Sequence, residues 1–157
     1  MLQALKQSPH PLIDQLEYLG NPMSGARSVL KRTPGLESIS DAFEDLVHSL
    51  SFLVSYNGSS ATFNSYRREV ERLLQWCWLV RGCSLGELRR QDLEDYVHFC
   101  QSPPAAWIGT KQVARFKNKQ GERVINPDWR PFVQRPTGRK RPSGDRTDRC
   151  NTVAASE

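Results

Sequence analysis

Three side chains spaced four residues apart, Asn64, Arg68 and Arg72, form the clearest pattern with chemical potential in this chain. Four-residue steps place them along one face of an α-helix. Arginine pairs with phosphate, or bidentately with a guanine edge, and asparagine adds hydrogen bonds. The pattern therefore indicates a helix face suited to a nucleic-acid groove. In the competing interpretation, Arg68 and Arg72 form only surface ion pairs with nearby Glu, worth less than about 1 kcal/mol each.

Further basic and hydrogen-bonding side chains extend this face. Arg67 lies at its flank, where it can reach a phosphate, and basic residues beyond position 110 continue the track. The complete set of candidate contact residues is Thr62, Asn64, Ser65, Arg67, Arg68, Arg72, Lys111, Arg115 and Lys117.

No catalytic constellation is apparent. Asp92, Glu94 and Asp95 face different directions on their helix, with no nucleophile or base near them in sequence. His48 is flanked by core positions and is expected at the core boundary. The chain has no glycine-rich phosphate loop, nucleophile elbow or HExxH motif. We therefore predict no enzymatic activity, no cofactor and no small-molecule substrate.

The cysteines and histidines predict no metal site. The four Cys form no CxxC pair, and the three His match no ligand spacing. There is no secretory signal and no apolar run of about 18 residues, so we expect no membrane span and a reduced, cytoplasmic setting.

The polar face belongs to a helix expected from Ser59 to Gly82. Ser59 is one of three candidate N-caps, and Gly82 ends the helix because glycine reaches the left-handed conformation without strain. Trp76 and Trp78 flank the apolar stripe, and at least one is expected at an interdomain or partner-facing edge. The predicted core positions of this helix are Phe63, Tyr66, Val70, Leu73, Leu74, Cys77 and Val80.

Two more helices are predicted, at 40–54 and 90–100. The first has its N-cap at Ser40 and ends at the turn Asn57-Gly58. Pro103-Pro104 closes the second. The first buries Ile39, Phe43, Leu46, Val47, Leu50 and Leu53, and the second buries Leu93, Tyr96, Val97 and Cys100.

These elements predict an all-α fold, a small helical bundle over 38–133. Prolines interrupt residues 1–37, which we interpret as a flexible N-terminal arm. Residues 134–157 have no hydrophobic period and are expected to be a disordered basic tail. The segment 126–133 is expected to be extended and to pack on the helices through its aromatic residues.

Charge is unevenly distributed along the chain. Residues 1–58 carry a net charge of −2, residues 59–102 a net charge of 0, and residues 103–157 a net charge of +7. Mean hydropathy is −0.60, which indicates a modest core with polar extensions. The basic excess favours an acidic partner such as nucleic acid.

The central helix resembles one in the core-binding domain of tyrosine recombinases, the phage-integrase family. Thr62, Tyr66, Val70 and Trp76 match its T-x-x-x-Y-x-x-x-[LV]-x-x-[FL]-[LF]-x-W pattern. The next element of the family is matched by Leu85, Leu88, Asp92, Leu93, Tyr96 and Phe99. With the helix at 40–54 and the segment 126–132, the resemblance covers about residues 40–133.

The resemblance implies that the chain binds double-stranded DNA as the smaller jaw of a clamp, in DNA integration or recombination by a mobile element. Nothing from Pro136 onward resembles the family's catalytic domain, and all four Tyr precede the region of its nucleophile. We therefore expect a non-catalytic fragment, truncated before the catalytic domain.

A second hypothesis is a helical protein-interaction module, or a truncated remnant that associates with an intact recombinase or with itself. Without the family's next helix, apolar surface around Trp76, Leu79 and Trp107 is expected to be exposed and to favour association.

Overall fold

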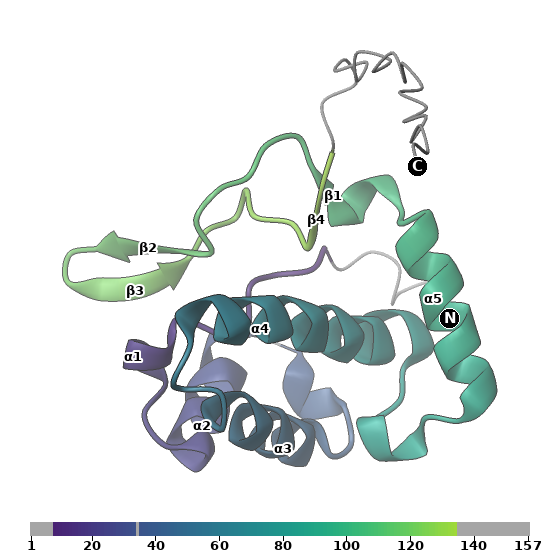
Figure 1. Ribbon diagram of the computed structural model, residues 1–157, viewed down its shortest axis with the longest axis horizontal. Helices are drawn as coiled ribbons and strands as arrows, with labels where there is room; N and C mark the ends of the chain where they lie inside the picture. The colour runs from purple at the N-terminus through teal and green to yellow at the C-terminus, as the bar shows by residue number, and fades with distance from the viewer. Residues whose placement is uncertain (1–7, 34, 135–157) are drawn as a thin grey trace, which may run out of the picture.

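The structure is a computed structural model that describes residues 8–33 and 35–134. Short 3₁₀ turns join its helices, and strands follow them (Figure 1). The α-helices are α1 (Leu16–Leu19), α2 (Pro22–Arg32), α3 (Ala42–Val54), α4 (Ser60–Gln75) and α5 (Arg90–Gln101). The strands are β1 (Ile108–Gly109), β2 (Phe116–Lys119), β3 (Glu122–Ile125) and β4 (Phe132–Val133).

The fold is mostly helical, but it is not purely all-α. β2 and β3 form an antiparallel hairpin, and β1 pairs with β4 in parallel. The hairpin turn places Gln120 and Gly121 at φ 52° and 83°, the two positive values of a type I′ turn. Sequence patterns missed these strands because each has at most four residues and β2 alternates weakly, with one buried position followed by three exposed ones.

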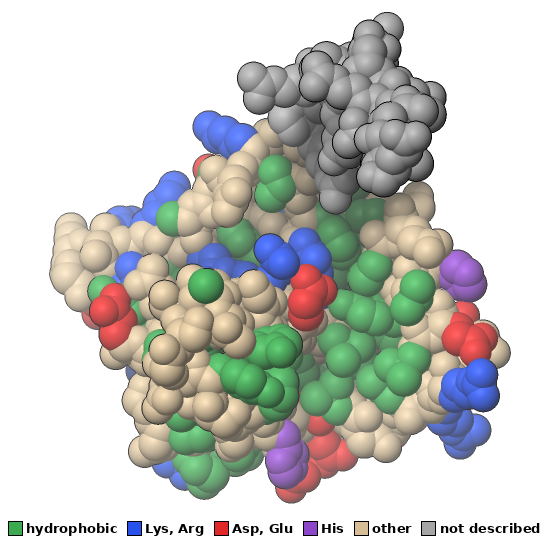
Figure 2. Space-filling view, in the orientation of Figure 1, with side chains coloured by type: hydrophobic (Ala, Val, Ile, Leu, Met, Phe, Trp, Pro, Cys, Tyr) green, Lys and Arg blue, Asp and Glu red, His purple; other side chains and the backbone are tan. Residues whose placement is uncertain are grey.

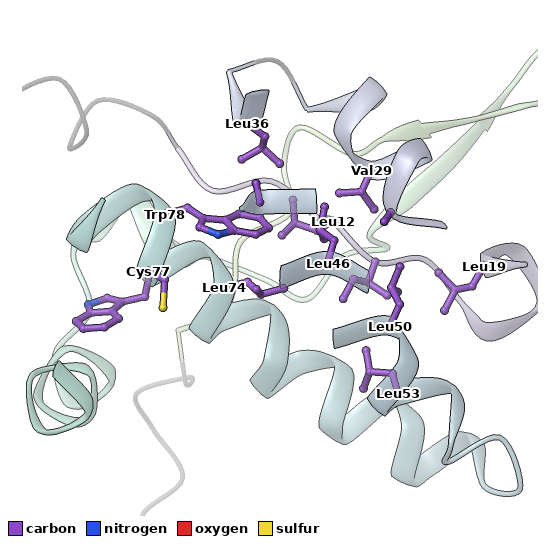
Figure 3. Close-up of a cluster of buried hydrophobic side chains, with 14 of the residues drawn as sticks. Leu12, Leu19, Val29, Leu36, Leu46, Leu50, Leu53, Leu74, Cys77 and Trp78 are labelled. Atoms are coloured by element: carbon purple, nitrogen blue, oxygen red, sulfur yellow. The ribbon is translucent and has the colours of Figure 1, made fainter. Parts of the chain in front are cut away.

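The core forms where α2, α3 and α4 meet. Figure 3 shows leucines from α3 and α4 converging with residues of the N-terminal segment. Leu46, Leu50 and Leu53 are fully buried on α3, as the sequence predicts. Each buried leucine contributes about 1.5–3 kcal/mol.

The segment interpreted as a flexible arm is folded over residues 8–33. α2 packs on α3, and Leu12 and Ile13 are buried in the core. Prolines prevent the segment around residue 10 from forming a helix, so the backbone N–H groups of this segment need other acceptors. The Gln75 side chain accepts from the His10 N–H at 3.0 Å, and Glu71 accepts from the N–H groups of Leu12 and Ile13. Residues 1–7 lie outside the described part of the chain.

α4 confirms the predicted central helix, with one change of face. Ser59 caps it by accepting from the Thr62 N–H at 3.3 Å, and Gly82 ends it at φ 67°. Its buried face includes Arg67, Glu71 and Gln75, whereas Tyr66, predicted as core, is 40% exposed.

The helix continues as a π-helical turn, Trp76–Arg81, whose wider winding changes the side-chain register. Both tryptophans are buried, contrary to the expected partner-facing edge. Trp78 Nε1 donates to Asp45 of α3 at 3.0 Å, and Trp76 packs on Tyr96 of α5 at 5.4 Å between ring centroids. The end of this helix is thus held between α3 and α5.

α5 confirms the predicted helix but not its predicted face. Leu93 and Val97 are 48% and 54% exposed, while Tyr96 and Phe99 pack on the core. The buried Asp92 forms an ion pair with Arg81 and accepts from the Arg89 N–H at 2.8 Å. These polar contacts of Asp92, which a hydrophobic pattern does not detect, set the rotation of α5.

The segment after α5 folds back over the helices, as predicted for its aromatic residues. Trp129 is buried, and Phe132 lies 6.4 Å from Phe99 between ring centroids. The N–H of Gln134 donates to Gly109 at 2.8 Å and closes the β1–β4 pair. The predicted tail lies outside the described residues from position 135 onward.

Candidate nucleic-acid interface

An open groove of about 650 Å³ lies between α4, the segment 111–116, the β2–β3 hairpin and residues 129–133. Figure 2 shows Lys and Arg side chains gathered in a band between the hairpin and α4. Asp14 is the only acidic residue among the described residues that line it. The basic lining residues are Arg67, Arg68, Arg72, Lys111, Arg115, Arg123 and Arg130.

The tertiary structure brings most of the predicted contact residues together. Thr62, in the first turn of α4, and Lys117, on β2, do not line the groove. The predicted residues that line it are Asn64, Ser65, Arg67, Arg68, Arg72, Lys111 and Arg115.

Three charged lining residues were not predicted from the sequence. The Asp14 carboxylate accepts hydrogen bonds from Arg123 of β3 at 2.6 and 2.9 Å. Arg130 donates to the carbonyls of Pro127 and Trp129, both at 2.7 Å. The Asp14–Arg123 pair spans 109 residues, so no local pattern could reveal it.

Arg72 is largely occupied by contacts within the protein. Its guanidinium donates to the Pro131 carbonyl at 2.8 and 3.0 Å and lies 4.2 Å from the Phe132 ring centroid. Glu69 forms ion pairs with both Arg72 and Arg68, at 3.2 and 3.1 Å. The ion-pair interpretation is therefore correct for these two contacts, although the Arg68 side chain remains half exposed.

Arg115 is held beneath the rim of the groove. It forms an ion pair with the buried Glu71, and its guanidinium lies 4.8 Å from the Trp129 ring centroid. Burial lowers the pKa of Arg115, and the nearby charges of Arg67 and Arg68 act in the same direction. Arg67 and Arg68 therefore lie close enough to Arg115 for their charges to act on its guanidinium.

Among the described residues, Arg67 has fewer partners for its charge and its N–H groups than the other arginines described above. The residue is only 8% exposed, and its Nε and Nη1 have no hydrogen-bond partner among the described residues. Its guanidinium lies 5.6 Å from the Phe63 ring centroid. Burial lowers the pKa of Arg67, while the Asp14 charge opposes that shift from beyond ion-pair distance. The groove thus contains a buried cation that forms no ion pair with any residue that the structure describes.

Other chemical groups give no second site in the described residues. No three His, Cys, Asp or Glu side chains there cluster as metal ligands, and no helix there is long and apolar enough to cross a membrane. Cys77 is buried, and burial raises the pKa of its thiol to about 12, so it stays protonated near neutral pH.

Comparisons with protein-family models, with curated proteins and with solved structures gave no match. The function must therefore be argued from the groove.

Proposed function

We propose that this chain binds double-stranded DNA through the groove between α4 and the β2–β3 hairpin. The observation that carries the proposal is the charge of this surface, where seven Lys and Arg side chains and one described carboxylate residue share one groove. A concentration of one charge in a concave surface attracts a polyanion and raises its rate of association. Neutralising phosphates also releases counterions, which drives binding at low salt.

The arrangement favours contact with the DNA backbone. Lys111 and Arg68 are exposed at the groove, whereas Arg72, Arg115 and Arg123 are held by protein partners. Asn64 and Ser65 are exposed on the same side of α4 and can donate further hydrogen bonds to phosphate. Binding should therefore depend strongly on salt and only weakly on base sequence.

At a finer level, we propose a role like that of the core-binding domain of tyrosine recombinases, in DNA integration or recombination. The resemblance along α4 and α5 supports this, as does the packing of Trp76 on Tyr96, two positions that match the family patterns. The chain would hold DNA without cutting it, in the cytoplasm, and catalysis would require another domain. Strand cleavage by the purified chain would contradict this part of the proposal.

The test is a fluorescence anisotropy titration with a labelled duplex at salt concentrations from about 50 to about 200 mM. The double variant Arg68→Ala/Lys111→Ala should bind more weakly, with a salt slope smaller by about 2. Arg90→Ala is the matched control, because that side chain is 94% exposed on α5 and does not line the groove. Equal affinities for the double variant and the wild type would remove the groove from the DNA interface.

A second candidate function is self-association or association with an intact recombinase. Trp76 and Trp107 are buried, so the surface first expected to favour this is covered. Leu93 and Val97 are exposed one turn apart on α5 instead, and Figure 2 shows hydrophobic side chains gathered over α5 and the nearby end of α4. Light scattering of wild type and Val97→Asp tests this. A wild type that stays monomeric at high concentration would count against self-association.

A further inference from the structure

The deepest basic side chain of the groove is placed to bind one specific anion. We propose that Arg67 forms the floor of a site for a single phosphate group, with Arg68 at its rim. This inference rests on the proposed groove function, but it makes a separate claim. The general attraction of the groove for a polyanion needs only surface charge, whereas this site needs one buried guanidinium.

Burying the charge of Arg67 is unfavourable in free energy. A buried charge is normally paired, because removal from water is unfavourable unless an opposite charge and hydrogen bonds replace the solvent. Arg67 has neither, since no ion pair is found for it in the described residues and two of its nitrogens have no hydrogen-bond partner there. An anion in the groove would supply both.

The carboxylates near Arg67 already pair with other groups. Glu71 lies one turn along α4, but it pairs with Arg115 and accepts backbone N–H groups from Leu12 and Ile13. Both oxygens of Asp14 accept from Arg123, and Asp14 acts on Arg67 only from beyond ion-pair distance. Within the described part of the chain, Arg115 and Arg123 therefore have carboxylate partners and Arg67 has no ion-pair partner.

The chemistry of the Arg67 guanidinium indicates which anion would bind. A guanidinium presents planar N–H donors that match the oxygens of phosphate. The positive charges of Arg67 and Arg68 both act on Arg115, so these basic groups lie near one another in this part of the groove. The shared chemistry is a phosphate oxyanion, either a phosphodiester of a DNA backbone or the phosphate of a small molecule.

The test measures thermal unfolding of the full chain in sodium phosphate and in sodium chloride of equal ionic strength. Phosphate should raise the unfolding midpoint saturably, by roughly 5 °C at high excess, because it binds only the folded state. Arg67→Met should abolish this rise and should itself unfold at a higher temperature in chloride, because it removes an unpaired buried charge. A merely structural arginine would give the opposite result in chloride.

Arg67→Lys, Arg68→Gln and Arg90→Gln complete the series. Arg67→Lys keeps the charge but loses the planar donors, so the rise in unfolding midpoint with phosphate should shrink, and Arg68→Gln at the rim should weaken the rise without abolishing it. Arg90→Gln, on the exposed face of α5 and outside the groove, should retain the full rise. If neither Arg67 variant folds, a phosphate titration of the wild type followed by ³¹P NMR still decides the matter. No saturable, phosphate-specific effect on the wild type would overturn the proposal.

The source of the phosphate is distinguished by direct titration. Inorganic phosphate, a mononucleotide and a short duplex are each titrated into the protein, with the unfolding midpoint as the readout, and binding of the labelled duplex is measured separately by anisotropy. Tight mononucleotide binding with no DNA binding would preserve the phosphate site and contradict the DNA function. Salt-dependent DNA binding that Arg67→Met leaves unchanged would overturn the phosphate site and preserve the DNA function.

Discussion

Asp14 and Arg123 are joined by two hydrogen bonds, of 2.6 and 2.9 Å, that tie the N-terminal segment to the β2–β3 hairpin. Arg123 also lies over the ring of Tyr18, at 4.3 Å from its centroid. Both residues line the basic groove, so the contact places the carboxylate of Asp14 in its lining. The proposed DNA function therefore predicts that stability and DNA affinity are opposed at this position.

Asp14→Asn should separate these two effects. The free energy of unfolding should fall by about 2 kcal/mol, because a buried carboxylate that pairs with Arg123 is lost. DNA affinity should rise, because the lining loses its negative charge while Arg123 stays. Urea unfolding and anisotropy titration measure the two quantities, and the exposed Asp95→Asn on α5 serves as the control. A loss of DNA affinity in a folded Asp14→Asn would contradict the groove interface.

A pair of leucines tests the packing of the helices. Leu50→Ala should lower the free energy of unfolding by about 3 kcal/mol, because the side chain is fully buried between α2 and α3. Leu93→Ala should change it by less than about 0.5 kcal/mol, since Leu93 is nearly half exposed on α5. Chemical denaturation compares them directly. A large loss of unfolding free energy in Leu93→Ala would mean that Leu93 is buried, as the sequence pattern predicts.

Stability should depend on pH through His10. Burial lowers the pKa of His10, and the positive charge of Arg130 lowers it further. The folded state therefore binds the His10 proton less readily than the unfolded state does. The contribution of His10 to the free energy of unfolding is complete above about pH 6.5, and it is lost as the pH falls through the pKa of His10 in the folded state. His10→Gln should remove this part of the pH dependence in unfolding midpoints measured across that range. His98→Gln, an exposed change on α5, should leave it intact.

The hairpin turn offers a test of backbone conformation. Gly121→Ala should destabilise the chain by about 1 kcal/mol, because Gly121 has a φ of 83°. Gln120→Asn should stabilise it slightly, since asparagine tolerates the left-handed conformation better. Gly86→Ala is the matched control, because Gly86 has open space around its Cα and no positive φ. Equal unfolding midpoints for the two alanine variants would argue against the type I′ turn.

The sequence by itself determined the three main helices, the stop at Gly82 and the polar face of α4, and it narrowed the N-cap of α4 to three candidates that include Ser59. These features are local, because caps and a 3.6-residue period act within a few turns of chain. Only the tertiary structure decided which polar residues are buried. Glu71 and Gln75 face inward because the proline-rich segment near residue 10 lacks a regular ladder, and their side chains accept its backbone N–H groups.

The same reasoning applies to the groove. A helical period places Asn64 and Arg68 on one face, but it carries no information about Arg130, or about Arg123, which contacts Asp14 109 residues away. Nor could a hydrophobic pattern show that Arg115 has a carboxylate partner and that Arg67 has none among the residues that the structure describes. Pairing over such distances depends on how the hairpin and the N-terminal segment dock on α4, and that is set by packing and charge in three dimensions.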